Sequence, residues 1–242
     1  MAWVDQPLVG FDTETTGVDV DRDRIVTAAI VRRTASGTTV SRWLIDPGVD
    51  IPAAATAVHG ITTEHARAWG VAPREALDEI AETLASAVVR AEPVVAFNAS
   101  FDLTLLDAEL RRHGLPTLPD RLGHPLRAVL DPLVLDRHLD RYRRGKRRLA
   151  DVCAHYGVAA EGLHAADADV VATLDVLAAM TQVYPQLAGT EPEELHRRQV
   201  DAHRLWAESF NAWRRDQGLA GPGAETTWPC RDARHLGGAA VA

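Results

Sequence analysis

The chain has 242 residues, of which 46% are hydrophobic and 25% are charged, as is ordinary for a soluble protein that buries a full core. Its formal net charge is −8, which disfavours a simple nucleic-acid-binding coat but not an enzyme that holds divalent metal ions. No apolar run approaches the roughly 18 residues that span a bilayer, and the N-terminus lacks a signal-peptide pattern, so we expect a cytoplasmic protein without membrane contact.

The N-terminal half of the chain predicts strands first and then alternating helices and strands. Three short runs predict strands at residues 7–11, 25–32 and 38–45. Apolar residues recur at helical spacing from Pro73 to Val88, which predicts a helix there. A compact strand over residues 94–97 and a helix over residues 101–113 follow.

The C-terminal half is mainly helical. A short apolar segment at residues 129–135 precedes helices near residues 149–156 and 166–183, and a capping-box pattern at residues 190–193 begins another helix that Gly218 ends. This order predicts an α/β fold with helices around a mixed sheet. The expected parts are a main domain at residues 1–185, a C-terminal helical extension at residues 186–218 and a flexible tail at residues 219–242.

Two carboxylates directly follow the first predicted strand. Residues two apart on a strand point to the same face, so Asp12 and Glu14 can meet one metal ion. Without a cation they would repel each other and have raised pKa values. An isolated Asp-x-Glu pattern more often marks a solvated acidic turn, but the strand before it and Gly17 behind it favour a site at a strand end.

Two further clusters carry groups of the same chemistry. Asp102 would stand in the first turn of a helix, where helix capping explains it as well as metal binding does. On one continuous helix His164 and Asp169 would be about 140° apart. They converge only if His164 lies in the loop before the helix and Asp169 lies within it. Asp167 is an alternative acidic candidate.

Four segments occur in an informative order: FDTETTG at residues 11–17, AVHGIT at 57–62, NASFDLTLL at 98–106 and HAADAD at 164–169. Together they resemble the motifs of the DnaQ-like, or DEDDh, 3′→5′ exonucleases over roughly residues 7–183. That family includes RNase T, oligoribonuclease and the proofreading epsilon subunit of bacterial DNA polymerase III.

The resemblance implies an RNase H-like fold with a five-stranded mixed sheet flanked by helices. It implies that the metal-binding carboxylates are Asp12, Glu14, Asp102 and Asp169, and that His164 is the general base. The residues it places near the terminal nucleotide are Thr13, Thr15, Thr16, His59 and Phe101.

These residue types suit phosphodiester hydrolysis with two divalent ions, Mg²⁺ or Mn²⁺. Two ions about 4 Å apart stabilise the attacking and leaving oxygens of an in-line displacement. Four carboxylates match two such ions in charge, and oxygen ligands are those that these ions prefer. A histidine that is neutral near pH 7 can take the proton of the attacking water.

We therefore expect an exonuclease that releases nucleoside monophosphates from the 3′ ends of single-stranded DNA, with RNA as an open alternative. Proofreading with a DNA polymerase subunit as partner and stand-alone trimming of DNA or RNA both stay open, because single-strand channels are largely sequence-tolerant. The rival hypotheses are a catalytically silent nucleic-acid-binding module on the same fold and a metal-dependent phosphohydrolase that acts on nucleotides.

Two weaker patterns lie outside these motifs. Arg141 to Arg148 contains the only dense basic run, which fits a phosphate contact and a solvated loop equally well. On the last predicted helix, Trp206 and Trp213 belong to an apolar stripe. That stripe favours core or interface packing over base stacking, and it also suits a partner protein.

Overall fold

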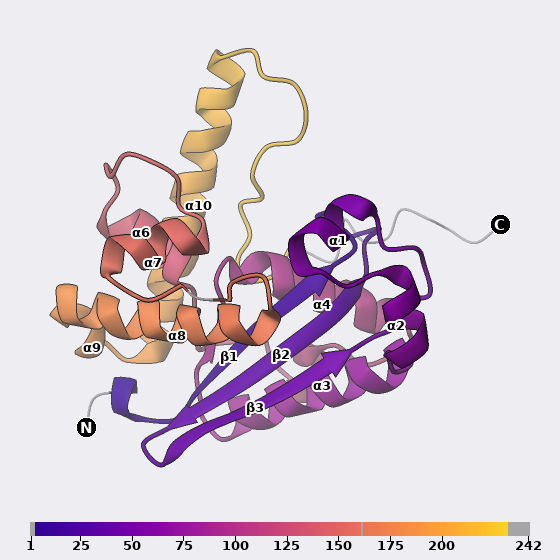
Figure 1. Ribbon diagram of the computed structural model, residues 1–242. Coiled ribbons are helices and arrows are strands. Elements are labelled where there is room, and N and C mark those ends of the chain that lie inside the picture. Colours follow the sequence, from indigo (N-terminus) through magenta and orange to yellow (C-terminus); the bar gives the residue numbers. More distant parts are fainter. Residues whose placement is uncertain (1–2, 161, 232–242) are drawn as a thin grey trace.

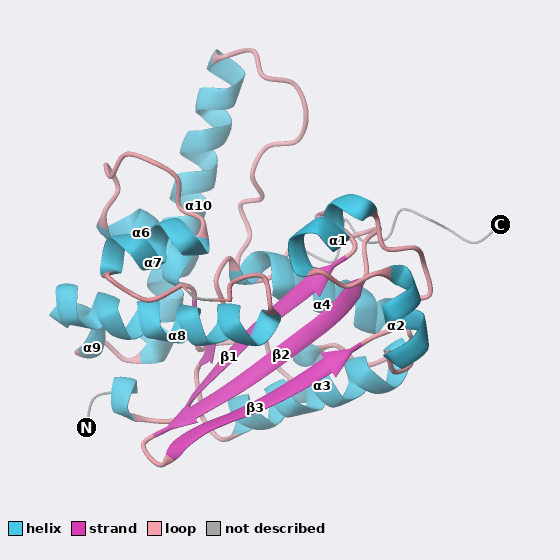
Figure 2. Ribbon diagram, in the orientation of Figure 1, coloured by secondary structure: helices cyan, strands magenta, loops and turns pink. Residues whose placement is uncertain are grey.

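Strand β1 (Leu8–Thr15) is the centre of the sheet in a computed structural model of the chain, which describes residues 3–160 and 162–231. Strands β2 (Ile25–Thr34) and β3 (Gly37–Leu44) extend the sheet on one side with antiparallel pairing. The short strands β4 and β5 extend it on the other side with parallel pairing; their bounds are Val94–Val95 and Val129–Leu130. The order is β3-β2-β1-β4-β5, a five-stranded mixed sheet as the family resemblance implies; Figure 2 labels β1, β2 and β3.

Helices cover both faces of this sheet (Figures 1 and 2). Helices α3 (Pro73–Val89) and α4 (Ala99–Arg112) pack on one face. Helix α8 (Ala166–Val183) packs across β1 and β2 on the other face, with α7 (Leu149–Tyr156) against it. The two layers enclose separate apolar cores, as the predicted α/β arrangement requires.

The two faces of β1 differ because successive residues of a strand point to opposite sides. Val9 and Phe11 pack in the core beneath α3 and α4. Gly10 faces α8, and a Cβ atom at this position would overlap Val170 Cγ1. The glycine therefore lets α8 approach β1 closely, which also brings Asp169, the residue before Val170, over the strand.

Several short elements were not predicted from the sequence. They are the 3-10 helix Trp3–Asp5, α1 (Ala53–His59), α2 (Thr63–Trp69), α5 (Leu118–Leu122) and α9 (Pro185–Ala188). The apolar segment at residues 129–135 divides into β5 and α6 (Pro132–Leu139), because Pro132 occupies the first position of a helix that Asp131 caps. Within residues 3–160 and 162–231, no helix is long and apolar enough to cross a membrane.

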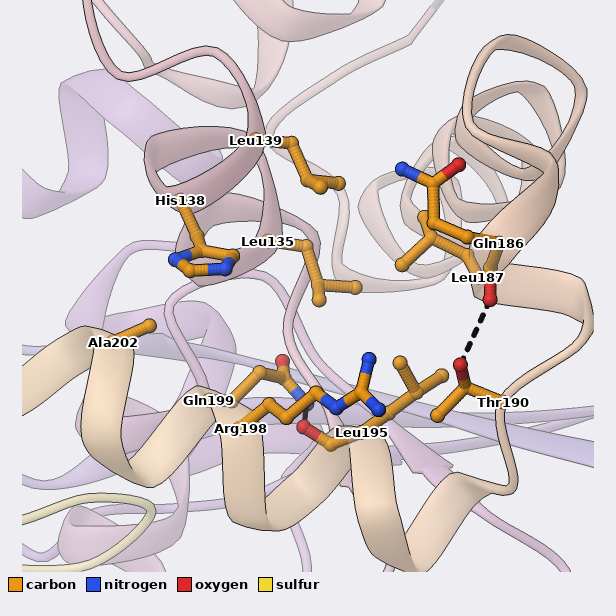
Figure 3. Close-up of a pocket in the computed structure, with 10 residues that line it drawn as sticks. All are labelled: Leu135, His138, Leu139, Gln186, Leu187, Thr190, Leu195, Arg198, Gln199 and Ala202. Atoms are coloured by element: carbon orange, nitrogen blue, oxygen red, sulfur yellow. Dashed lines mark hydrogen bonds between the residues drawn. The ribbon is translucent and has the colours of Figure 1, made fainter.

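The long C-terminal helix α10 (Pro192–Asp216) is present, but the predicted capping box at its start is wrong. Glu191 is the N-cap residue and makes no capping hydrogen bond through its side chain. The Thr190 hydroxyl instead donates to the Gln186 carbonyl at 2.8 Å, beside a cavity of about 50 Å³ between α6, α9 and α10 (Figure 3). The Thr190 hydroxyl is thus bonded to the preceding turn, α9, and does not cap α10.

The composition predicts a flexible tail from residue 219 onward. In the structure, residues 219–231 return from the tip of α10 to the main body (Figure 1). The Asn211 side chain holds this segment: its Nδ2 donates to the Ala224 carbonyl at 2.8 Å, and its Oδ1 accepts from the Ala224 N–H at 2.7 Å. Trp228 is then only 5% exposed and packs in the core beneath α3 and α4. The segment is thus packed rather than free, and the rest of the expected tail, residues 232–242, lies outside the described residues.

We predict that a Gly10→Ala substitution moves α8 away from β1 and lowers the melting temperature, since Val170 is β-branched and has little freedom to rotate away. Overpacking costs about 1–3 kcal/mol, which for a chain of this size lowers Tm by roughly 2–12 °C. A second substitution, Val170→Ala, should recover part of the loss. An unchanged Tm in the Gly10→Ala variant would contradict the close approach of α8.

Candidate metal centre

The acidic motif lies where β1 leaves its regular pairing with β2. The register shifts between Glu14 and Thr15, an irregularity of the kind found beside active sites. Asp12 and Glu14 point to the same face of β1. Asp169, in the first turn of α8, joins them there: one oxygen from each of the three carboxylates lies within 4.8 Å of the others.

His164 and Asp169 occupy the two kinds of position that their convergence requires. His164 lies in the turn before α8 with a φ of 79°, and Asp169 lies within the helix. The backbone N–H of His164 donates to Asp169 Oδ1 at 3.1 Å. This bond ties the turn to the helix, while the residue itself stays exposed to solvent. The predicted loop-and-helix placement is confirmed.

Asp102 lies beside the three-carboxylate cluster rather than in it. It is buried in the first turn of α4, where its Oδ1 accepts from the Thr13 N–H at 3.1 Å and from the Thr13 hydroxyl at 2.6 Å. Thr13 points to the opposite face of β1 from Asp12 and Glu14. The structure therefore brings together three of the four expected metal-binding carboxylates and holds the fourth beside them through its hydrogen bonds with Thr13.

A buried carboxylate outside the predicted motifs, Asp131, orients the start of α4. It is 1% exposed, and its oxygens accept from the backbone N–H groups of Asn98 at 3.0 Å and Ala99 at 2.9 Å. These bonds hold Asn98 in the left-handed conformation from which α4 begins. The N–H of Asp131 in turn donates to Gln199 Oε1 of α10 at 2.7 Å. Helix α10 thus supports the turn that positions Asp102.

The carboxylates of the site oppose one another electrostatically. Burial raises the pKa of Asp12 well above its usual value, and repulsion from the other three carboxylates adds to the shift. Burial and repulsion from Asp169 and Asp102 raise the pKa of Glu14 to about 7. Burial likewise raises the pKa of Asp102 to about 7, against the hydrogen bonds from Thr13. Burial raises the pKa of Asp169 as well.

These properties fit a divalent cation. A cation between Asp12, Glu14 and Asp169 would offset the repulsion that adds to burial in raising the pKa values of Asp12 and Glu14. The cluster offers oxygen ligands alone, which suit Mg²⁺ or Mn²⁺ better than metals that prefer nitrogen or sulfur. The donor set can therefore bind a hard metal ion.

Asp167, the alternative acidic candidate, is turned to another partner. Its Oδ2 accepts from Arg42 of β3 at 2.5 Å, and this hydrogen bond lowers its pKa. The pair joins the edge of the sheet to the first turn of α8. Arg42 belongs to no motif, and 125 residues separate it from its partner, so no local pattern indicates this contact.

A cleft of about 230 Å³ opens beside the cluster, and Glu14, His59 and His164 contribute to its lining. His59 Nδ1 accepts from the Ile61 N–H at 3.1 Å, so Nε2 carries the proton of the neutral ring. Burial lowers the pKa of His59, although the backbone of Thr15 opposes the shift. Nε2 is buried, and its contact with the Thr15 backbone falls short of a well-formed hydrogen bond. A buried donor of this kind is a candidate ligand contact.

The other residues expected near the terminal nucleotide are engaged in the protein itself. The hydroxyl of Thr15 donates to the Gly17 carbonyl at 2.6 Å, and that of Thr16 donates to Asp23 at 2.9 Å. Phe101 is partly buried against the core beneath α4. Together with the bond from Thr13 to Asp102, these contacts shape the site rather than present free hydroxyls to it.

Two cations of the basic run, Arg143 and Arg147, are bound inside the protein, whereas the others are exposed. Arg143 donates to Oδ2 of the fully buried Asp136 at 2.6 Å, and Arg147 forms an ion pair with the same oxygen. Tyr156 donates to the other oxygen of Asp136 at 2.9 Å. Of the two hypotheses for this run, neither describes Arg143 and Arg147, whose role is structural, and neither guanidinium is free for a phosphate.

Comparisons with known proteins agree with this geometry. A family model described as an exonuclease, of RNase T type, matches residues 9–177. The DNA polymerase III PolC-type protein of Streptococcus thermophilus is 35% identical over 170 residues, which cover 68% of this chain and 10% of that protein. Its counterpart in Streptococcus sanguinis is 33% identical over 174 residues, or 70% and 11% of the two chains. The chain thus spans about a tenth of the length of these relatives.

Solved structures of exonuclease I share the fold. Escherichia coli exonuclease I in complex with a dT13 oligonucleotide has a TM-score of 0.62 at 20% identity, and the match covers 75% of this chain and 42% of that one. Exonuclease I from Methylocaldum szegediense has a TM-score of 0.62 at 23% identity, with 86% and 45% covered. The likeness confirms the predicted RNase H-like sheet and its flanking helices.

The raised pKa values predict how the metal-free protein responds to pH. The Glu14 carboxyl has an ordinary pKa of 4.5 and a folded-state pKa of about 7, so the unfolded chain loses this proton first as pH rises. The stability of the folded state should therefore fall between about pH 4.5 and pH 7. Mg²⁺ or Mn²⁺ should restore most of it.

The measurement is Tm against pH in EDTA, with Glu14→Gln as the matched variant. Other groups titrate in the same range, so the readout is the difference between the parent and the variant. The variant should lose less stability toward pH 7. If the curves of Tm against pH for the parent and the variant are parallel, ionisation of Glu14 does not destabilise the folded protein.

Proposed function

Because the chain belongs to the RNase T-type exonuclease family, we propose that it hydrolyses single-stranded DNA from the 3′ end and releases nucleoside monophosphates. The observation that carries this proposal is the cluster of Asp12, Glu14 and Asp169 at the end of β1. Three carboxylates with raised pKa values, beside an open cleft, form a site suited to cations that act on a phosphodiester.

The carboxylates divide between two ion positions in this proposal. Asp12, Glu14 and Asp169 would hold one Mg²⁺ or Mn²⁺, and Asp102 would help Asp12 to hold a second. Bound ions of this type stabilise the charge that develops on the attacking and leaving oxygens of the phosphate. The chain itself fixes the carboxylates: Thr13 orients Asp102 through two hydrogen bonds.

His164 is the residue that we assign to proton transfer. It lines the same cleft as Glu14, and its backbone bond to Asp169 keeps it next to the cluster. A neutral imidazole accepts a proton from the water that attacks the terminal phosphate. The bond to the O3′ atom of the preceding nucleotide breaks, and that oxygen then takes a proton.

His59 supports a terminal nucleotide in the cleft. Its Nε2–H is a buried donor that a sugar hydroxyl or a base oxygen would satisfy. The pKa of the ring is lowered, so the ring stays neutral and acts as a donor through one fixed nitrogen. Phe101 would pack beside the same nucleotide from the first turn of α4.

DNA is our preferred substrate because of what the related proteins are. The PolC-type relatives are DNA polymerases, and exonuclease I of Escherichia coli was solved with a DNA oligonucleotide. The similarity to the PolC-type DNA polymerases favours a cytoplasmic proofreading role beside a polymerase subunit. Stand-alone trimming of RNA is the alternative that a direct comparison of substrates would reveal.

The first test is digestion of 5′-labelled single-stranded DNA and RNA of the same sequence. A ladder that shortens from the 3′ end is expected with Mg²⁺ or Mn²⁺ and should stop with EDTA. Asp12→Ala should abolish turnover yet leave a folded protein, whose metal-free form melts no lower than the parent because repulsion is relieved. Undiminished hydrolysis after rigorous metal removal would refute the mechanism.

The second test concerns His164. Replacement by alanine should lower kcat by roughly 10²–10⁴-fold, the usual worth of a positioned acid–base group. Mn²⁺ affinity measured by calorimetry should stay near the parent value, because the carboxylates supply the protein ligands. His164→Gln keeps a polar group that cannot take the proton, so it should be almost as harmful. A glutamine variant with parental kcat would rule out the proton-transfer role.

A further inference from the structure

A surface groove of about 470 Å³ lies between α6, the segment that follows it and the outer half of α10. Figure 1 shows this half of α10 standing out from the main body beside α6. We call it the α10 groove; its lining residues include Arg137, Arg141, Leu205, Trp206, Phe210 and Trp213. None of the roles assigned above uses this surface.

The aromatic side chains of the α10 groove form a continuous stack. Trp206, Phe210 and Trp213 are spaced i, i+4, i+7, so they lie on one face of the helix. The rings of Trp206 and Phe210 are 5.5 Å apart and inclined by only 12°, and those of Phe210 and Trp213 are 5.8 Å apart and inclined by 29°. The outermost ring, Trp213, is 52% exposed. Of the core or interface packing that the sequence pattern favours for this stripe, the exposure of Trp213 excludes full burial in the core.

Arginine side chains accompany the stack. The Arg137 guanidinium lies 3.9 Å from the centre of the Trp206 ring, and that of Arg214 lies 5.9 Å from the centre of Phe210. Arg141 lines the groove at the start of the basic run. Among the described residues, Arg137 and Arg141 form no salt bridge, unlike Arg143 and Arg147.

The charge of the groove contrasts with that of the whole chain. None of its described lining residues is an aspartate or a glutamate, although the chain has a net charge of −8. Cations that form no salt bridge among the described residues and lie beside flat aromatic rings match a polyanion that carries flat bases. Single-stranded nucleic acid has both properties, and stacking on aromatic side chains tolerates any base.

We propose that the α10 groove binds the part of a single strand that lies upstream of the 3′ end being cut. The inference rests on the proposed nuclease function for the identity of that strand. A base would stack on the exposed ring of Trp213, which ends the aromatic stack, and Arg141 would meet the phosphates. The groove would thereby hold long strands on the enzyme, whereas a strand of a few nucleotides would depend on the cleft at Glu14 alone.

The test measures equilibrium binding to the full chain by fluorescence anisotropy in EDTA, where no turnover occurs. The probes are a labelled 20-nucleotide single strand and the matching 20-base-pair duplex. Trp213→Ala and Arg141→Gln should each weaken binding of the single strand by roughly 5- to 10-fold. Arg141→Gln should also reduce the salt dependence by about one counterion. Trp213→Ala should leave duplex binding unchanged, because paired bases cannot stack on the ring.

The matched control is Trp69→Ala, which removes another exposed tryptophan, 74% exposed, on α2. It should bind the single strand like the parent. Circular dichroism would establish that each variant folds. If Trp213→Ala does not fold, the binding affinity of Arg141→Gln tests the proposal instead. Parental affinity in both folded groove variants would overturn the proposal and leave a protein partner as the occupant.

Failure of this inference and failure of the proposed function are separable, because binding in EDTA requires no hydrolysis. A parent that binds the strand through the groove but never shortens it with Mg²⁺ or Mn²⁺ would refute the nuclease function and keep the groove. If the parent shortens strands and the groove variants bind the strand as the parent does, the nuclease function is kept and the groove proposal is refuted. Equal losses on single strand and duplex in Trp213→Ala would also overturn base stacking.

Discussion

The close packing of α8 on β1 at Gly10 is the contact on which the candidate site depends. Asp12 and Glu14 come from a strand near the N-terminus, and Asp169 comes from a helix more than 150 residues later. Only a helix that lies almost against the strand brings the three carboxylates within 4.8 Å. Because Gly10 has no side chain, α8 can approach β1 closely enough to bring the three carboxylates together.

That concentration of charge is supported from the opposite face of β1. Thr13 ties Asp102 to the strand, and Asp131 holds the turn from which α4 begins. These supports are hydrogen bonds between buried groups, which are costly to break because a partner left behind would be unsatisfied. These hydrogen bonds therefore hold the carboxylates in place despite their mutual repulsion.

Local periodicity was enough to predict four of the strands, the long helices and part of the site, whereas the five-stranded sheet was implied by the family resemblance. The two-residue period of a strand placed Asp12 with Glu14, and the helical angle placed His164 in a turn and Asp169 in a helix. Contacts between distant residues were beyond such reasoning: the pairs Arg42–Asp167, Thr13–Asp102 and Gln199–Asp131 have no local pattern. Helices of four to seven residues, such as α9 and α1, were also not predicted, because one or two helical turns show little hydrophobic periodicity.

The route of the C-terminal segment has a consequence for the length of chain that the candidate site needs. The family match ends at residue 177, yet Gln199 and Trp228 both form hydrogen bonds with Asp131, which sets the turn before Asp102. The chain beyond the family match is therefore joined to the shared fold through a buried carboxylate. A fragment trimmed to the family boundary would keep every residue of the motifs and lose the support beneath one of them.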